Sequence, residues 1–151
     1  MMPNREFWSG KRVLLTGHTG FKGSWLAFWL HRLGARVTGY ALSPTTQQPL
    51  FHQLGLPSVL VDRQGDVNHL ESLKRVVADT EPQVLIHMAA QSVVRESYND
   101  PVKTFTTNVT GTVNALEAVR SLKSIRAILV VTSDKCYENI EKMHSYTECD
   151  P

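Results

Sequence analysis

Short apolar runs alternate with amphipathic segments along the whole chain, and this alternation limits the choice of fold more than any other feature. The runs have the length and content of strands buried on both faces, whereas the segments between them carry apolar residues at helical spacing. We expect strands at residues 11–16, 36–42, 59–62, 83–88 and 126–132 and helices at residues 20–33, 68–79 and 101–121. Strands that alternate with helices form parallel sheets with right-handed crossovers, so the sequence predicts a doubly wound α/β fold.

The predicted helix boundaries depend on a few residues. Gly34 stands where a stop signal for the first helix belongs, Asn68 is a candidate N-cap of the second helix, and Pro101 opens the third. Residues 43–57 contain three prolines, so we expect a loop there with one short helical turn at residues 50–54.

Size and composition are those of one globular domain. A chain of 151 residues with 42% hydrophobic and 20% charged residues can bury about two-thirds of its unfolded surface. The net charge is +2, and the 16 lysines and arginines are scattered, so we expect no nucleic-acid partner. No apolar stretch approaches the roughly 20 residues of a membrane span, and the N-terminus lacks the apolar core of a signal peptide. We therefore expect a cytoplasmic protein with no membrane partner.

The two cysteines, Cys136 and Cys149, are expected to be free thiols. They could pair with each other, or join His144 at a metal ion. Two thiols and one imidazole lack the spacing of a zinc site, however, so we expect no metal.

A glycine-rich loop follows the first predicted strand. It reads TGHTGFKG, with Gly17, Gly20 and Gly23 three residues apart. Glycines at this place allow a tight turn and let backbone N–H groups approach a pyrophosphate, whose charge is stabilised by the N-terminus of the next helix. A P-loop would need Gly-Lys-Ser, whereas here Lys22 precedes the last glycine. The loop therefore predicts a dinucleotide site.

The glycine spacing also resembles the TGxxGFxG fingerprint of the extended short-chain dehydrogenases/reductases, in which Phe21 would be the aromatic residue. This resemblance implies NAD as the cofactor. It implies that the loop binds NAD through Gly17, Gly20, Phe21, Lys22 and Gly23.

Two later segments extend the resemblance. Asp66 and Val67 follow the third strand, where the family has an Asp that binds the adenine amino group. The segment HMAAQ resembles the HxAA motif of the family, which implies that the cofactor lies against Ala89, Ala90 and Gln91. The two alanines could instead be ordinary core residues.

A third segment, TNVTGT, lies in the third predicted helix. It resembles the NVxGT motif, in which Asn108 would support the active site. Without the resemblance, Asn108 would be read as a surface or capping residue.

The end of the second strand does not indicate which nicotinamide cofactor binds. An NAD site usually has an acid there for the ribose hydroxyls, yet no acid occurs between Glu6 and Asp62. Residues 40–43 contain no arginine for a 2′-phosphate either. The preference for NAD over NADP therefore follows from the family resemblance.

The last predicted strand ends in Ser133, Asp134 and Lys135. The triplet resembles that of nucleotide-sugar 4,6-dehydratases, and its order resembles the CDP-glucose 4,6-dehydratases rather than the Thr-Asp-Glu of the dTDP-glucose enzymes. The resemblance implies that Ser133 binds the oxygen being oxidised, that Asp134 protonates the departing C6 hydroxyl, and that Lys135 takes the C5 proton. CDP-glucose would then be the substrate, and the product would enter deoxysugar and O-antigen synthesis.

The role of Lys135 stays open between two alternatives. An amine with an ordinary pKa near 10.4 is protonated at neutral pH, so Lys135 can act as a base only where burial or a nearby cation lowers its pKa. Otherwise it supports the enolate electrostatically. Ser92 and Arg95 follow the fourth strand and either contact the sugar or phosphate or lie in a solvated loop.

The tyrosine and lysine of the YxxxK motif that the family uses for oxidation do not occur in this sequence. We therefore expect residues 1–151 to be an incomplete N-terminal dinucleotide-binding domain, without the substrate domain and inactive alone. The alternatives are an epimerase or reductase on the same scaffold, or an NAD-binding module without chemistry. Helix 101–121 carries apolar residues on more than one face, so we also expect a homodimer.

Overall fold

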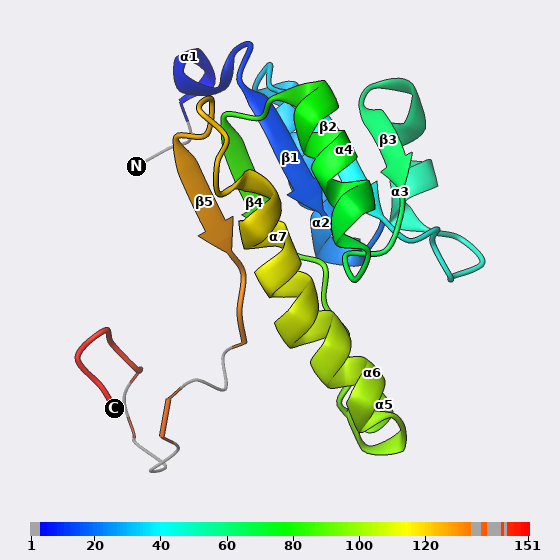
Figure 1. Cartoon of the computed structure of the whole chain (residues 1–151), viewed down its shortest axis with the longest axis vertical. Helices are drawn as coiled ribbons and strands as arrows, with labels where there is room; N and C mark the ends of the chain where they lie inside the picture. Colours follow the sequence, from blue (N-terminus) through cyan, green and yellow to red (C-terminus); the bar gives the residue numbers. More distant parts are fainter. Residues whose placement is uncertain (1–3, 134–136, 139–142, 144) are drawn as a thin grey trace.

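A parallel sheet of five strands forms the centre of the computed structural model, which describes residues 4–133, 137–138, 143 and 145–151 (Figure 1). The strands are β1 (Arg12–Thr16), β2 (Arg36–Ala41), β3 (Val61–Gln64), β4 (Val84–His87) and β5 (Ala127–Val130). Their order is β3-β2-β1-β4-β5, and all neighbours are parallel. The predicted doubly wound fold is confirmed, and the strand order reverses between β1 and β4, where such sheets bind ligands.

Helices cover both faces of this sheet (Figure 1). On one face, α2 (Phe21–Arg32) packs Ala27 and Leu30 onto a core that includes Val13 and Leu15 of β1. On the other face, α4 (Leu70–Thr80) and α7 (Gly111–Val119) pack around Leu14 of the same strand. The side chains of β1 thus alternate between two buried cores, which explains why its three central residues are all apolar.

The predicted helix at residues 101–121 is one continuous helix with an irregular centre. It comprises α6 (Pro101–Phe105), a π-helical turn labelled η2 (Thr106–Thr110) and α7. The side chain of Asp100 caps the start by accepting the Lys103 N–H at 2.9 Å. Figure 1 shows that this helix runs beyond the carboxyl ends of the strands, so its first half faces the edge where ligands bind.

The third strand begins two residues later than predicted. The apolar pair of Val59 and Leu60 follows a 3₁₀ turn, η1 (Leu56–Ser58), and both backbone N–H groups donate to the Leu56 carbonyl. The predicted turn at residues 50–54 is confirmed as α3 (Leu50–Gln53).

The prediction that Asn68 caps the second helix is wrong. His69 is the N-cap of α4, and the backbone N–H of Asn68 donates to Asp66 Oδ1 at 2.9 Å. The carboxylate of Asp66 therefore orders the turn before the helix and delays the helix start by one residue.

Two further short helices were not predicted. They are α1 (Arg5–Trp8) and α5 (Val94–Asn99), and neither contains a buried residue. Within the described residues, none of the helices is both long and apolar enough to span a bilayer.

Candidate dinucleotide site

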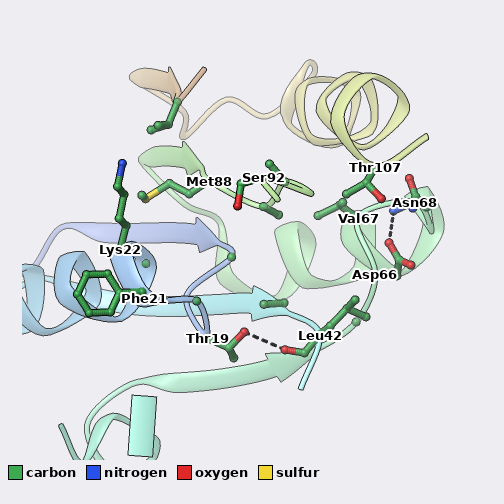
Figure 2. Close-up of a pocket in the computed structure, with 18 of the residues that line it drawn as sticks. Thr19, Phe21, Lys22, Leu42, Asp66, Val67, Asn68, Met88, Ser92 and Thr107 are labelled. Carbon is green, nitrogen blue, oxygen red and sulfur yellow. Dashed lines mark hydrogen bonds between the residues drawn. The ribbon is translucent and has the colours of Figure 1, made fainter. Parts of the chain in front are cut away.

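A crevice of about 590 Å³ lies at the carboxyl ends of β1, β2 and β4, where the predicted site segments meet (Figure 2). Nine of the predicted cofactor residues line it: Gly17, Gly20, Phe21, Lys22, Gly23, Asp66, Val67, Ala89 and Ala90. Its size falls within the range of about 300–1,000 Å³ found for ligand pockets. The topology alone therefore gathers segments that are far apart in the sequence.

The fingerprint loop (residues 16–23) has no room for a side chain at Gly17 or at Gly23. Gly17 has a φ of +75°, and a Cβ atom there would lie 2.8 Å from the Ala89 nitrogen. A Cβ at Gly23 would lie 2.1 Å from the Gly17 carbonyl oxygen. Both glycines are therefore needed for the close approach of the loop to the helix and to the 88–90 segment.

The start of α2 suits an anion. Its N-cap is Gly20, no side chain of the described residues caps it, and its first turn contains no acidic residue. The N–H groups and dipole of a helix of this length favour a phosphate at such an end. Lys22 adds a positive charge to the crevice, and Phe21 is 71% exposed beside it. These features fit the pyrophosphate of a dinucleotide.

The Asp66 turn forms the opposite part of the crevice (Figure 2). Its backbone carbonyl accepts a hydrogen bond from the Tyr40 hydroxyl at 3.1 Å, and burial together with the Asp66 charge raises the pKa of Tyr40. Asn68 Oδ1 is buried and accepts no hydrogen bond from the described residues. The turn thus offers the Asp66 carboxylate to a donor such as the adenine amino group.

Gln91 and Asn108 do not line the crevice but hold one of its walls. The backbone N–H of Gln91 donates to Asn108 Oδ1 at 2.7 Å, and Asn108 Nδ2 donates to the Gln91 carbonyl at 3.0 Å. The side chain of Gln91 is bound in turn by Val93 and Thr104. Asn108 is thus neither a free surface residue nor a cap. It pins the segment after β4 to the π turn.

His18, inside the fingerprint loop, has a role that the sequence did not indicate. Its ring is fully buried, and Nε2 lies 2.9 Å from Asp62 Oδ1 of β3. The ring occupies the space that a side chain at Gly39 would need, since a Cβ there would lie 2.2 Å from it. Burial lowers the pKa of His18, and Asp62 opposes that shift. The contact ties the loop to β2 and β3.

The crevice also includes residues that the motifs did not single out. They are Thr19, Ala41, Leu42, Gly65, Asn68, Met88, Lys103, Thr107, Val131 and Thr132, together with Ser92, whose contact with sugar or phosphate was one of two alternatives. Thr19 Oγ1 donates to the Leu42 carbonyl at 2.9 Å (Figure 2). Most of these residues lie within two positions of a strand end, and that position is the signal that could have found them.

The end of β2 offers neutral groups. Ser43 Oγ donates to Gln64 Oε1 at 2.8 Å, so these two polar side chains are paired with each other. Among the residues that line the crevice, Asp66 is the acid and Lys22 and Lys103 are the bases.

The predicted catalytic triplet is only partly described. Ser133 is exposed and follows Val131 and Thr132, which line the crevice. Asp134 and Lys135 lie outside the described residues, as do Cys136 and His144. Cys149 is a free, exposed thiol, and the described side chains contain no group of three potential metal ligands.

Comparison with known proteins gives consistent matches. The sequence model of the GDP-mannose 4,6-dehydratase family matches residues 14–151. CDP-glucose 4,6-dehydratase of Salmonella typhimurium is 47% identical over 150 residues, which are 99% of this chain and 42% of that protein. CDP-paratose 2-epimerase of Salmonella typhi is 29% identical over 92% of this chain and 41% of its own length. The chain thus spans about two-fifths of these curated relatives.

Solved structures share the same architecture. UDP-glucose 4-epimerase from Brucella ovis, in complex with NAD, has a TM-score of 0.67 and 29% identity over 80% of this chain and 35% of its own. UDP-glucose-4-epimerase from Stenotrophomonas maltophila, with bound NAD and formylated UDP-arabinopyranose, has a TM-score of 0.78 and 21% identity, covering 88% of this chain and 40% of that one. The second likeness shows the fold alone.

Proposed function

Because the chain belongs to the GDP-mannose 4,6-dehydratase family of the extended short-chain dehydrogenases/reductases, we propose that the protein containing it is an NAD-dependent CDP-glucose 4,6-dehydratase. The observation that carries the proposal is the identity with the Salmonella typhimurium enzyme along nearly the whole chain. The Ser-Asp-Lys order of residues 133–135 supports the same substrate. The product would be CDP-4-keto-6-deoxyglucose, a precursor of deoxysugars in surface polysaccharide.

The cofactor proposal rests on the geometry of the crevice. The loop between Gly17 and Gly23 would hold the pyrophosphate, and Asp66 would accept from the adenine amino group. Bound NAD would supply reversible hydride acceptance, so the overall reaction has no net oxidation. An isothermal titration of the full-length protein with NAD and with NADP tests this part, since tighter binding of NADP would contradict it.

The proposed chemistry gives each side chain of the triplet a separate role, and the C4 hydroxyl proton would pass to the tyrosine of the YxxxK motif. Ser133 hydrogen-bonds the C4 oxygen of the sugar while that carbon is oxidised. Asp134 protonates the C6 hydroxyl as it leaves, and Lys135 either takes the C5 proton or supports the enolate. Ser133 comes directly after Val131 and Thr132, which line the crevice, and this position supports a substrate bound next to the cofactor.

An assay of the full-length protein with CDP-glucose tests the activity. We expect a 4-keto product that absorbs in base. Absence of that product would overturn the proposed function, and equal turnover of dTDP-glucose would overturn the assignment of CDP-glucose as the preferred substrate.

The second candidate is an epimerase, which the similarity to CDP-paratose 2-epimerase supports. An epimerase needs no residues for the elimination of water. Asp134→Asn should therefore abolish product formation in a dehydratase while NAD still binds, but should leave an epimerase active. The matched variant Glu138→Gln changes an exposed acid four residues further on and should have no effect.

We also propose that the protein is a homodimer that pairs through the long helix. Five exposed apolar side chains recur at spacings of three or four residues along it: Val102, Phe105, Val109, Val113 and Leu116. Covering such a stripe favours association. Sedimentation of the full-length protein should show a dimer that Val109→Arg dissociates, whereas Asp79→Lys on the exposed surface of α4 should not dissociate it.

A further inference from the structure

The ring of His87 connects three of the segments that surround the crevice. His87 ends β4 and is 2% exposed. Its Nδ1 lies 2.8 Å from Thr16 Oγ1 at the end of β1, and its Nε2 lies 3.2 Å from Thr112 Oγ1 in α7. Although His87 belongs to the HMAAQ segment, it does not line the crevice, so any effect on a ligand must pass through its neighbours.

The direction of each hydrogen bond around the ring follows from the partners. The Thr112 hydroxyl donates its hydrogen to the Asn108 carbonyl at 2.7 Å, so it can only accept from His87, and Nε2 must carry a hydrogen. Thr16 Oγ1 accepts two backbone N–H groups, from Met88 at 3.1 Å and Ala89 at 3.2 Å.

These two amides occupy both lone pairs of the Thr16 hydroxyl. Its hydrogen is therefore donated to His87 Nδ1, which must be unprotonated. The ring is neutral, in the Nε2–H tautomer, and both nitrogens are paired. A buried polar group that is fully paired in this way fixes its surroundings, because any displacement leaves a donor or acceptor without a partner.

The chain of hydrogen bonds leads to both ends of the segment 88–91. At one end are the amides of Met88 and Ala89, two residues of the crevice wall. At the other end is the π turn, where the Asn108 carbonyl is held by Thr112 and the Asn108 side chain holds Gln91. The ring of His87 thus sets the distance between the two supports of this wall.

We propose that His87 is a positioning residue for the dinucleotide: its neutral ring fixes the 88–91 wall against β1 and against the π turn. The inference rests on the proposed function, since it takes NAD to be the ligand of the crevice. His87 touches neither ligand nor reacting atoms and acts through Met88, Ala89 and Asn108.

The test uses the full-length protein and measures the Kd of NAD by calorimetry, well below the unfolding temperature. His87→Phe keeps the shape of the ring and removes both hydrogen bonds, and we expect a rise in Kd of about tenfold, which corresponds to 1.4 kcal/mol. Thr112→Val should raise the Kd similarly, whereas Thr112→Ser, which keeps the hydroxyl, should bind NAD as the wild-type protein does.

A double-mutant cycle separates positioning from general loss of stability. If His87 and Thr112 act through one link, His87→Phe combined with Thr112→Val should raise the Kd no more than His87→Phe alone. Additive effects would overturn the inference. If His87→Phe fails to fold, the pair of Thr112→Val and Thr112→Ser tests the same link, and equal Kd values for those two variants would overturn it.

A second measurement does not depend on the ligand. The ¹⁵N–¹H correlation spectrum of protein labelled in histidine should show His87 as the Nε2–H tautomer at neutral pH, and an Nδ1–H tautomer or an imidazolium would overturn the inference. Failure of the wild-type protein to bind NAD would instead overturn the proposed function. That outcome differs from tight binding by both the wild-type protein and His87→Phe, which would overturn only the positioning role.

Discussion

Replacing Gly23 by alanine tests the close contact inside the fingerprint loop. The new Cβ would lie 2.1 Å from the Gly17 carbonyl oxygen, whereas ordinary van der Waals contact begins at 3.4 Å. The loop and the first turn of α2 would have to separate by about 1.3 Å, the difference between these two distances. Overpacking costs about 1–3 kcal/mol, and we expect the upper end, about 3 kcal/mol, because backbone rather than a flexible side chain must move.

The assay is urea unfolding of the full-length protein, with and without NAD. Gly20→Ala is the matched control, because its Cβ would meet the Gly17 oxygen at 3.4 Å and its φ of −74° is ordinary for alanine. Alanine instead of glycine at this N-cap should cost less than about 1 kcal/mol. Gly23→Ala should also lose most of the stabilisation that NAD gives, since the displaced Gly17 peptide lines the crevice. Equal unfolding midpoints for the two variants would refute the reasoning.

Three further predictions concern the groups around the crevice. Burial lowers the pKa of both His18 and His87, so below about pH 6.5 the unfolded chain binds more protons than the folded chain. The free energy of unfolding, measured by urea titration, should therefore fall as the pH drops from about 6.5 to about 5. A free energy of unfolding that rises over this range would contradict the prediction. Tyr40→Phe removes the hydrogen bond to the Asp66 carbonyl and should lower the free energy of unfolding by about 1 kcal/mol. An unchanged free energy of unfolding would contradict this prediction. Asn108→Ala removes both bonds to the Gln91 backbone and should speed amide hydrogen exchange in residues 88–91, while Asn99→Ala in exposed α5 serves as its control.

The doubly wound fold and the segments that form the crevice could be predicted from the sequence because they depend on features with strong local signals. β1 and β4 each contain three consecutive apolar residues, because both strands are covered on both faces. β3 was misplaced for the opposite reason. It is a short edge strand with mostly exposed side chains, and the nearby apolar pair of Val59 and Leu60 lies in the turn that precedes it.

Other features depend on contacts that a linear pattern does not contain. The π turn at residues 106–110 keeps the helical spacing of apolar residues, so periodicity cannot distinguish it from an α-helix. His18 occupies a variable position of the TGxxGFxG pattern, and its burial depends on the missing side chain of Gly39, which lies 21 positions away. Asn68 has a side chain suited to an N-cap, but its backbone N–H donates to Asp66 Oδ1, and His69 becomes the N-cap instead.

The exposed last strand has a consequence for handling these 151 residues by themselves. Among the residues that the structure describes, β5 pairs only with β4, and Ile128 and Leu129 are 45% and 54% exposed. An apolar edge strand presents unpaired backbone N–H and C=O groups beside exposed hydrophobic side chains, so other chains can pair with it and aggregate. We expect residues 1–151, expressed by themselves, to aggregate through β5, and Leu129→Lys to raise the amount that stays in solution after centrifugation.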